Sequence, residues 1–528
     1  MLKKTPSIFN DVIGPVMRGP SSSHCAAGTR IGLLARALMG NTIESVLIEF
    51  DRAGSLATTH ESQGSDMGLC GGFLGLAPTD ERLVCYREEI RKAGIQVQFK
   101  NGSYGDAHPN TYRLRLKNAQ ETHDLVALSV GGGMIEIVEI DGHTVSMQGD
   151  LYETLVYFER KEKDIVQNVE KILHGKNDIQ VLNRQHAEKN FMRITSSAPL
   201  GDSQIDAISA EHGAISIKFL PPVLPISTPR EMNVPFESCE QMLAFNRNRH
   251  LSLTELAILY ESARGGLSRK EIHHKMINIV RTMKSSLKTG LAGTRYKDRI
   301  LGCQSALYHE KQKSGHLLDL GILNRIILYV TALMEAKSAM GVIVAAPTAG
   351  SCGGLPGTVL GAAEVMGRSE SEIAESMLAA GLIGIFISTF STFAAEVAGC
   401  QAECGAGSGM AAAALVTLMG GTTENAVAAA SMALQNSLGM ICDPVANRVE
   451  VPCLGKNVMA AGNAVSCANM ALAGYDPVIP LDEVIHAMDD VGKRIPGEFR
   501  CTALGGLSMT ETSKRIEKNL LTPEISRT

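Results

Sequence analysis

The chain has 528 residues, of which 45% are hydrophobic and 20% charged, with a formal net charge of −5. This length exceeds what one hydrophobic core normally supports, so it predicts two or three domains, and the composition excludes wholesale disorder. Without a basic excess, with 4% aromatic residues and with no Trp, the chain is not expected to bind nucleic acid.

The cellular location follows from the first residues and from the cysteines. The N-terminus carries two lysines but no long apolar stretch, so it is not read as a secretory signal. Twelve cysteines in such a chain indicate a reducing compartment, and we expect a cytoplasmic protein.

One segment tests the expectation that no membrane is involved. Residues 377–395 contain no charge and are long enough to cross a bilayer. They include Gly381 and Gly384, are bracketed by Glu375 and Glu396, and lack flanking basic residues and an aromatic belt. We therefore predict a buried central helix of a large helical domain rather than a membrane span.

The first 150 residues alternate short apolar runs with helical stretches. Strands are predicted where β-branched and aromatic residues recur, at residues 45–50, 95–99, 111–116, 125–130 and 134–140. Helices are predicted at residues 26–40 and 86–94. The pattern predicts an α+β domain over residues 1–150.

The rest of the chain divides into three further parts, giving a multidomain protein. Residues 151–220 read as strand–helix–strand–strand–helix–strand, which is the order of a small ferredoxin-like domain. The proline-rich residues 221–237 predict a linker. In residues 238–528 Ala, Gly, Met and Leu dominate at helical spacing, which predicts an all-α domain.

Three cysteines with glycine and proline neighbours, Cys400, Cys442 and Cys453, are candidate cluster ligands. The chain contains no CxxC pair, which argues against a zinc ribbon or a thioredoxin-type redox site. Dispersed thiols of this kind suit an iron–sulfur cluster held by loops at helix ends. On spacing alone, scattered cysteines in a hydrophobic core are the commoner explanation.

A candidate anion site lies at the start of the first predicted helix, where residues 19–24 read GPSSSH. Hydroxyls and free backbone N–H groups at a helix start suit an amino-acid carboxylate, although a serine cap with nothing bound is the commoner case. Residues 348–350 form a second turn of small residues. Residues 129–133 (SVGGG) are either a third such turn or a strand end that needs positive φ.

Several longer sequence motifs resemble those of a known family. AAPTAGSCGG (345–354), GCQAECGAGSGMAAAA (399–414) and CDPVANRVEVPC (442–453) resemble the signature stretches of the iron–sulfur L-serine dehydratase α-chain. Residues 13–32, HPNT (108–111) and SVGGG resemble the β-chain of that family. The chain thus resembles a β–α fusion, with residues 151–220 where two-chain members carry an ACT domain.

The resemblance implies a lyase of amino-acid degradation and gluconeogenesis. Such an enzyme dehydrates L-serine to aminoacrylate, which becomes pyruvate and ammonia, and an open iron of a [4Fe–4S] cluster acts as Lewis acid. The family's cluster ligands match Cys400, Cys442 and Cys453, and the candidate bases are His24, His60 and His108. The candidate substrate-binding residues are Ser21, Ser22, Ser23, Asn110, Thr111, Gly132, Thr348, Gly350 and Arg500. The expected partner is a small amino acid, and the expected assembly is a homo-oligomer, most simply a dimer.

Several positions depart from the family pattern. Gln63 stands where the family has a histidine, with His60 three residues earlier, and Cys25 and Cys501 each replace other residues in matching motifs. The chain ends EISRT, without the terminal cysteine that caps the open iron in some members. These departures leave two alternatives, the same cluster chemistry on another β-hydroxy or β-thio amino acid and a non-catalytic amino-acid sensor. They also suggest Cys501 as a fourth ligand or a substrate contact.

Overall fold

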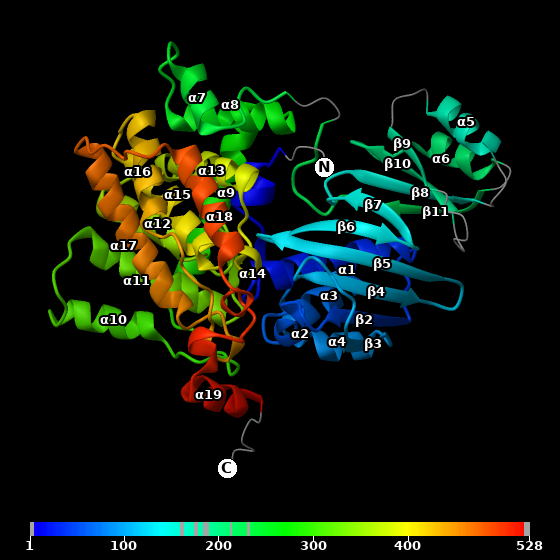
Figure 1. The fold of residues 1–528 in the computed structure, drawn as a ribbon, viewed down its shortest axis with the longest axis horizontal. Helices are drawn as coiled ribbons and strands as arrows, with labels where there is room; N and C mark the ends of the chain where they lie inside the picture. The colour runs from blue at the N-terminus through cyan, green and yellow to red at the C-terminus, as the bar shows by residue number, and fades with distance from the viewer. Residues whose placement is uncertain are drawn as a thin grey trace.

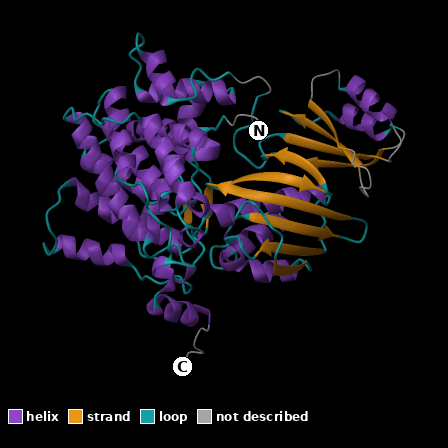
Figure 2. Cartoon of the chain, viewed as in Figure 1, coloured by secondary structure: helices purple, strands orange, loops and turns teal. Residues whose placement is uncertain are grey.

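The computed structural model describes residues 5–158, 163–173, 178–182, 190–211, 214–229 and 233–521. A helical body occupies one side of the molecule and two sheet-based units occupy the other (Figure 1). Colouring by secondary structure makes the division plain, because nearly all long strands lie on one side (Figure 2). The prediction of a multidomain protein with an α/β N-terminal region and a helical C-terminal region is confirmed.

The N-terminal domain is built on a mixed sheet of six described strands, in the order β3-β2-β4-β5-β6-β7. Only the β2–β3 pair is parallel among these pairings. Alternate side chains of β5 are buried, as expected for a strand with one face on a core. The strands are β2 (Ser45–Asp51), β3 (Gln96–Gly102), β4 (Thr111–Lys117), β5 (Thr122–Gly131), β6 (Met134–Ile140) and β7 (His143–Met147).

Helices α1 (Ala27–Leu38) and α3 (Ser65–Phe73) pack closely against each other beside this sheet. Glycines permit the close approach, because a Cβ at Gly68 would lie 2.2 Å from the carbonyl oxygen of Cys25 and one at Gly72 would lie 2.4 Å from that of Thr29. Shorter helices α2 (Leu56–Thr59) and α4 (Tyr86–Lys92) complete the domain. This packing fixes the positions of residues 21–26 and 55–65. Both segments contribute to one wall of the candidate active site.

The small unit follows the predicted order of strands and helices. Its sheet has the order β11-β8-β10-β9, and each described pairing is antiparallel. Val156, Phe158, Ile194 and Ile208 form its own buried core. The elements are β8 (Tyr152–Phe158), α5 (Lys163–Ile172), β9 (Asp178–Leu182), β10 (Asn190–Ser196), α6 (Asp202–Ser209) and β11 (Ala214–Leu220).

The helical domain surrounds α13, whose apolar middle is buried among neighbouring helices. Several helices begin at a serine with a glutamate three residues later, a capping box that satisfies the first backbone N–H groups, as at Ser252, Ser268 and Ser369. The helices are α7 (Cys239–Asn246), α8 (Leu253–Gly265), α9 (Arg269–Leu291), α10 (Gln304–Lys313), α11 (Ile322–Ser338), α12 (Gly354–Val365), α13 (Glu370–Phe390), α14 (Ala395–Ala398), α15 (Cys404–Leu418), α16 (Thr423–Gln435), α17 (Cys453–Leu472), α18 (Leu481–Arg494) and α19 (Glu511–Leu521).

Helix α13 covers most of the uncharged segment noted in the sequence. Within the described ranges it is the one helix long and apolar enough to cross a membrane, and 78% of its apolar window is buried inside the protein. Most side chains from Ile373 to Ile387 are inaccessible to water. The segment therefore serves as the central helix of a folded domain, as predicted.

The start of the chain packs into the helical domain rather than onto the sheet. Ile8, Phe9 and Val12 lie in the large hydrophobic core that also contains the α13 side chains. Strand β1 (Val16–Arg18) then pairs with β12 (Val342–Val344) from the helical domain. These contacts join the two large domains. The chain continues from them directly into residues 19–24.

Candidate active site

Segments of both large domains meet at a small cavity. Its lining residues are Ser21 and Gln63 from the N-terminal domain and Gly350, Ala395, Glu396, Glu403, Cys442, Pro444, Val449, Cys453 and Cys501 from the helical domain. The cavity thus collects thiols, carboxyl groups and a hydroxyl at a domain interface. Such a concentration of polar and titratable groups in a buried place marks a candidate active site.

The cysteines come from segments that begin or precede helices. Cys400 follows Gly399, whose φ of 71° turns the chain, and Cys404 and Cys453 begin α15 and α17. Cys442 lies in a loop and exchanges backbone hydrogen bonds with the segment at Cys501, including Cys501 N to Cys442 O at 3.0 Å. Cys400, Cys404, Cys442 and Cys501 pack together in one buried cluster, and the buried Cys453 lines the adjoining cavity.

The thiols influence one another and face a cation. The thiol contact with Cys404 lowers the pKa of Cys400, whereas burial raises the pKa of Cys453. Lys456 donates to Asp443 Oδ1 at 2.9 Å. Burial alone would lower the pKa of Lys456, but the Cys400 thiolate and Asp443 raise it above its usual value. The site therefore contains a positive charge that can balance thiolates.

These thiols must be compared with the needs of a metal group. Within the part of the chain that the structure describes, no group of three or more His, Cys, Asp or Glu side chains is placed to hold a metal ion. An iron–sulfur cluster makes a different demand, because each thiolate binds its own iron and the sulfurs need not converge on one point. Cys400, Cys442 and Cys453, buried together near Lys456, fit that demand.

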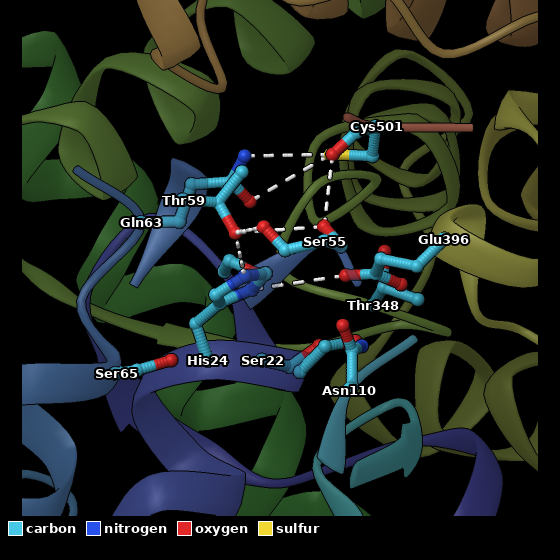
Figure 3. A network of polar contacts seen from close by, with 12 residues as sticks. Ser22, His24, Ser55, Thr59, Gln63, Ser65, Asn110, Thr348, Glu396 and Cys501 are labelled. Atoms are coloured by element: carbon cyan, nitrogen blue, oxygen red, sulfur yellow. Dashed lines mark hydrogen bonds and ion pairs between the residues drawn. The ribbon is translucent and has the colours of Figure 1, made fainter. Parts of the chain in front are cut away.

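A polar network forms the wall on the side of the N-terminal domain. His24 Nδ1 lies 2.9 Å from Ser21 Oγ, and His24 Nε2 lies 2.8 Å from Thr59 Oγ1. Ser55 Oγ donates to the carbonyl oxygen of Cys501 at 2.9 Å (Figure 3). Burial lowers the pKa of His24 to about 3, with a smaller contribution from His60. His24 is therefore a neutral imidazole at pH 7, fixed by two hydroxyls.

The turn of small residues at 348–350 adjoins this wall and contributes Gly350 to the lining of the cavity. Thr348 Oγ1 donates to Glu403 at 2.6 Å, and the backbone N–H of Ala349 donates to Ser22 Oγ at 3.2 Å. A Cβ at Gly350 would lie 2.8 Å from a Glu403 carboxyl oxygen, so glycine is needed for this approach. Burial raises the pKa of Glu403 to about 8, and Cys400 adds to the shift. The turn thus connects the N-terminal domain to the cysteine segment.

The structure brings most of the predicted substrate-binding residues to this interface. Ser21 and Gly350 line the cavity, and Ser22 and Thr348 make the contacts just described. Asn110 and Ser23 lie close to Glu396. Thr111 Oγ1 donates to the carbonyl oxygen of His108, and Gly132 approaches the carbonyl oxygen of Pro347.

Other predicted residues have side chains engaged elsewhere. His60 Nδ1 lies 2.7 Å from Asp66 Oδ1, and its ring stacks on Phe99. The half-buried His108 accepts a hydrogen bond from the backbone of Asn110 at 3.2 Å. The Arg500 guanidinium donates to backbone carbonyl oxygens at the end of α18. Among the described residues no histidine lines the cavity itself, and His24 is the predicted histidine whose ring contacts a lining residue, Ser21.

Sequence reasoning missed several residues of the site. Glu396 and Glu403 are buried carboxyl groups at the cavity, and Asn457 donates to the carbonyl oxygens of Gly350 and Cys453 at 2.9 and 2.8 Å. Glu396 could have been noticed in the sequence, because it is the charged residue that ends a long uncharged segment. Thr59 and Ser55 gave no signal, since isolated hydroxyl residues are common in any sequence.

A buried cavity that gathers carboxyl groups and thiols from two domains, with His24 in the network beside it, is typical of an enzyme active site. Residues 244–508 match the protein family described as serine dehydratase alpha chain. The chain belongs to the L-serine dehydratase family.

Two alpha chains match about half of the chain, and a longer relative matches nearly all of it. A probable L-serine dehydratase alpha chain of Bacillus subtilis is 34% identical over 285 residues, covering 54% of this chain and 95% of the relative. The L-serine dehydratase alpha chain of Peptoniphilus asaccharolyticus is 37% identical, covering 52% and 94%. An L-serine dehydratase of Helicobacter pylori (strain ATCC 700392 / 26695) is 26% identical over 501 residues, covering 93% of this chain and 96% of the relative.

Proposed function

We propose that this protein is an iron–sulfur L-serine ammonia-lyase that dehydrates L-serine to aminoacrylate, which yields pyruvate and ammonia. Cys400, Cys442 and Cys453 would hold a [4Fe–4S] cluster. The observation that carries the proposal is that these cysteines, 42 and 11 residues apart in the sequence, are buried together where both large domains contribute polar side chains. Relatives named L-serine dehydratase support the substrate.

The chain's own residues would bind the substrate and move its proton. When bound, the cluster would supply a Lewis-acidic iron for the substrate carboxylate and the departing hydroxyl. Removal of the α-proton needs a group that is unprotonated at neutral pH. His24 meets this condition because burial lowers its pKa to about 3; the low pKa also makes it a weak base, so the assignment rests on its position, where Ser21 and Thr59 fix its ring beside the cavity. We therefore assign proton abstraction to His24 rather than to His60 or His108.

The domain organisation forms part of the same proposal. The region before residue 150 would correspond to a β-chain fused to the α-chain region, which the long match to the Helicobacter pylori relative supports. The unit from β8 to β11 would be a ferredoxin-like domain of the ACT type, which its element order and antiparallel sheet support. A homodimer in the cytoplasm, acting in amino-acid degradation and gluconeogenesis, remains our prediction.

Anaerobic purification tests the cluster and the reaction separately. We expect visible absorbance of an iron–sulfur chromophore, close to four irons and four sulfides per chain, and release of pyruvate and ammonia from L-serine. A colourless protein without iron would contradict the cluster. Cys442→Ser should lose iron and activity. Cys467→Ser is the matched control, because Cys467 is equally buried but contacts Asn436 outside the site.

A second candidate substrate is favoured by one contact. Gln63 and Cys501 face each other at the cavity, where the family pattern has other residues. Another β-hydroxy or a β-thio amino acid would then replace serine. Incubating the cluster-loaded protein with a panel of β-substituted amino acids decides between them, because turnover of another member with serine inert would favour this candidate. Binding of amino acids without any turnover would favour a sensor.

A further inference from the structure

We infer that Glu396, with the Asn110 amide beside it, forms the subsite that receives the α-ammonium group of an amino-acid substrate. The inference rests on the proposed function and deepens it, because it assigns the group that distinguishes an amino acid from the corresponding hydroxy acid. It depends on three observations: an unpartnered buried carboxyl oxygen, an unpartnered buried amide, and the position of both beside the thiol-lined cavity.

The first observation is the environment of Glu396. Its side chain is 4% exposed, and its Oε1 lies 3.7 Å from His24 Nδ1. Its Oε2 has no hydrogen-bond partner among the described residues. Burial raises the pKa of Glu396, while Asn110 and Ser23 lie near enough to offset this only in part. A buried carboxylate is costly without a cation, so a positively charged ligand next to Glu396 would stabilise its ionised form.

The second observation is Asn110, which comes just before β4. It is fully buried, and within the described structure neither its amide nitrogen nor its amide oxygen has a hydrogen-bond partner. The Oγ of the neighbouring Ser129 is also without one, although the Ser129 backbone donates to the Asn110 carbonyl oxygen at 3.0 Å. Each such group costs about 1–3 kcal/mol. A polar ligand that forms hydrogen bonds with the Asn110 amide and the Ser129 hydroxyl would explain why these groups lie together.

The third observation is where these groups lie. Glu396 lines the same cavity as Cys442, Cys453 and Cys501. Figure 3 shows its carboxyl group reaching toward His24, with Asn110, Ser22 and Thr348 drawn alongside. A ligand in this place would lie next to both the thiols and the Glu396 carboxyl.

The neighbouring cations are already engaged. Lys456 pairs with Asp443, and the buried Lys337 donates to the carbonyl oxygen of Val449. His24 is neutral at pH 7, as its lowered pKa shows. Glu403 differs from Glu396 because it already accepts a hydrogen bond from Thr348. Glu396 is therefore the carboxyl group of the cavity that is poised to accept an ammonium group.

Kinetics of Glu396→Gln test the assignment. We expect iron and sulfide contents like those of the wild type and a KM for L-serine raised about 30-fold or more, because one partner of a buried charge pair is lost. Glu375→Gln is the control, since its carboxyl is 48% exposed on α13 and lies outside the cavity. An unchanged KM with a reduced kcat would overturn the inference and make Glu396 part of proton transfer.

A measurement on the wild-type protein keeps the inference testable if the variant fails to fold. Thermal stabilisation by L-serine and by 3-hydroxypropanoate, which lacks only the amine, is compared in the cluster-loaded protein. We expect serine to stabilise at concentrations at least about 30-fold lower. Equal potency would overturn the subsite. If serine binds preferentially but is not turned over, the proposed reaction fails while the ammonium subsite stands.

Discussion

The side-chain amide of Gln63 lies 3.3 Å from the sulfur of Cys501 and donates to it. The two residues belong to different domains, and the same segment is also held by Ser55, which donates to the Cys501 carbonyl oxygen. Cys501 has a φ of 60°, a left-handed conformation that costs a non-glycine residue about 1–3 kcal/mol. Contacts from the N-terminal domain therefore hold Cys501 in a strained position beside Cys442.

Removing this thiol tests whether it binds the cluster or faces the substrate. We predict that Cys501→Ala keeps the iron and sulfide content of the wild type, because Cys400, Cys442 and Cys453 provide the ligands. The preference among β-substituted amino acids should change instead. Loss of iron from Cys501→Ala would show that it is a fourth ligand.

The coupling between the two side chains can be measured directly. We predict that Gln63→Ala and Cys501→Ala are not additive in their effects on KM, with a coupling energy of about 0.5–3 kcal/mol, as found for residues in contact. Pairing Gln63→Ala with Cys467→Ala is the control, because Cys467 contacts Asn436 and not Gln63. Additive effects for Gln63 and Cys501 would mean that their contact does not influence the substrate.

The buried His24 predicts a defined dependence of stability on pH. Its pKa is about 3 in the folded protein against 6.5 in an unfolded chain, so the unfolded state binds more protons between these values. The contribution of a neutral His24 is fully present above pH 6.5 and is lost as the pH falls toward 3. The expected loss is about 1.4 kcal/mol per pH unit below 6.5.

Unfolding experiments on His24→Gln check this expectation. The variant is expected to lose less stability than the wild type when the pH is lowered from 7 to 5. His316→Gln is the control, because that side chain is exposed at the surface. Parallel curves for the wild type and His24→Gln would contradict a buried neutral imidazole.

The sequence predicted secondary-structure elements where a single hydrophobic periodicity, that of a strand or that of a helix, dominates. Strands β2 to β6 and helix α1 lie where alternating or helical patterns placed them. Strand β7 was missed because a histidine, His143, occupies an inward position of its alternation. The packing of residues 8–12 under α13 was also missed, because a short apolar segment does not indicate which distant core it joins.

Residues of the candidate site could be predicted only where they belong to long sequence motifs. The cysteines and the GPSSSH turn became candidates in this way, and Ser21, Cys442 and Cys453 line one cavity. Thr59, Ser55 and Asn457 depend on contacts between segments far apart in the chain, which no local pattern encodes. His60 was a candidate from proximity in sequence, but Asp66 and the aromatic ring of Phe99 hold it in another place.

Substitutions of two glycines in the helical domain distinguish an effect on the geometry of the site from an effect on overall stability. We predict that Gly350→Ala lowers activity strongly, because the new Cβ would lie 2.8 Å from the Glu403 carboxyl group. Gly462→Ala in α17 meets no atom within 4 Å and should raise the free energy of unfolding by about 0.5–1 kcal/mol through helix propensity. Assays of activity and thermal unfolding on both variants check the pair. A fully active Gly350→Ala would show that this turn does not shape the site.

The buried Glu261 predicts how the start of the chain is fastened to the helical domain. Its carboxylate accepts hydrogen bonds from Ser7 Oγ at 2.5 Å and from the Ile8 backbone at 2.8 Å, and its side chain is inaccessible to water. Glu261→Ala leaves these donors without partners and removes the contact that holds Ile8 against α13, where it faces Gly381. Each of the two buried donors left unpaired costs about 1–3 kcal/mol, so we predict a loss of about 2–6 kcal/mol in the free energy of unfolding.

The same substitution should also loosen the first residues before the whole protein unfolds, because they lose their polar anchor while the helices around α13 keep their own packing. Limited proteolysis under native conditions checks this, with cleavage near Ile8 expected in Glu261→Ala. The matched control is Glu424→Ala, since Glu424 is an exposed residue at the start of α16. Because residues 13–24 continue from this anchor to the hydroxyls around His24, Glu261→Ala should lower activity as well. Full activity together with early cleavage would show that the site is positioned independently of the anchored N-terminus.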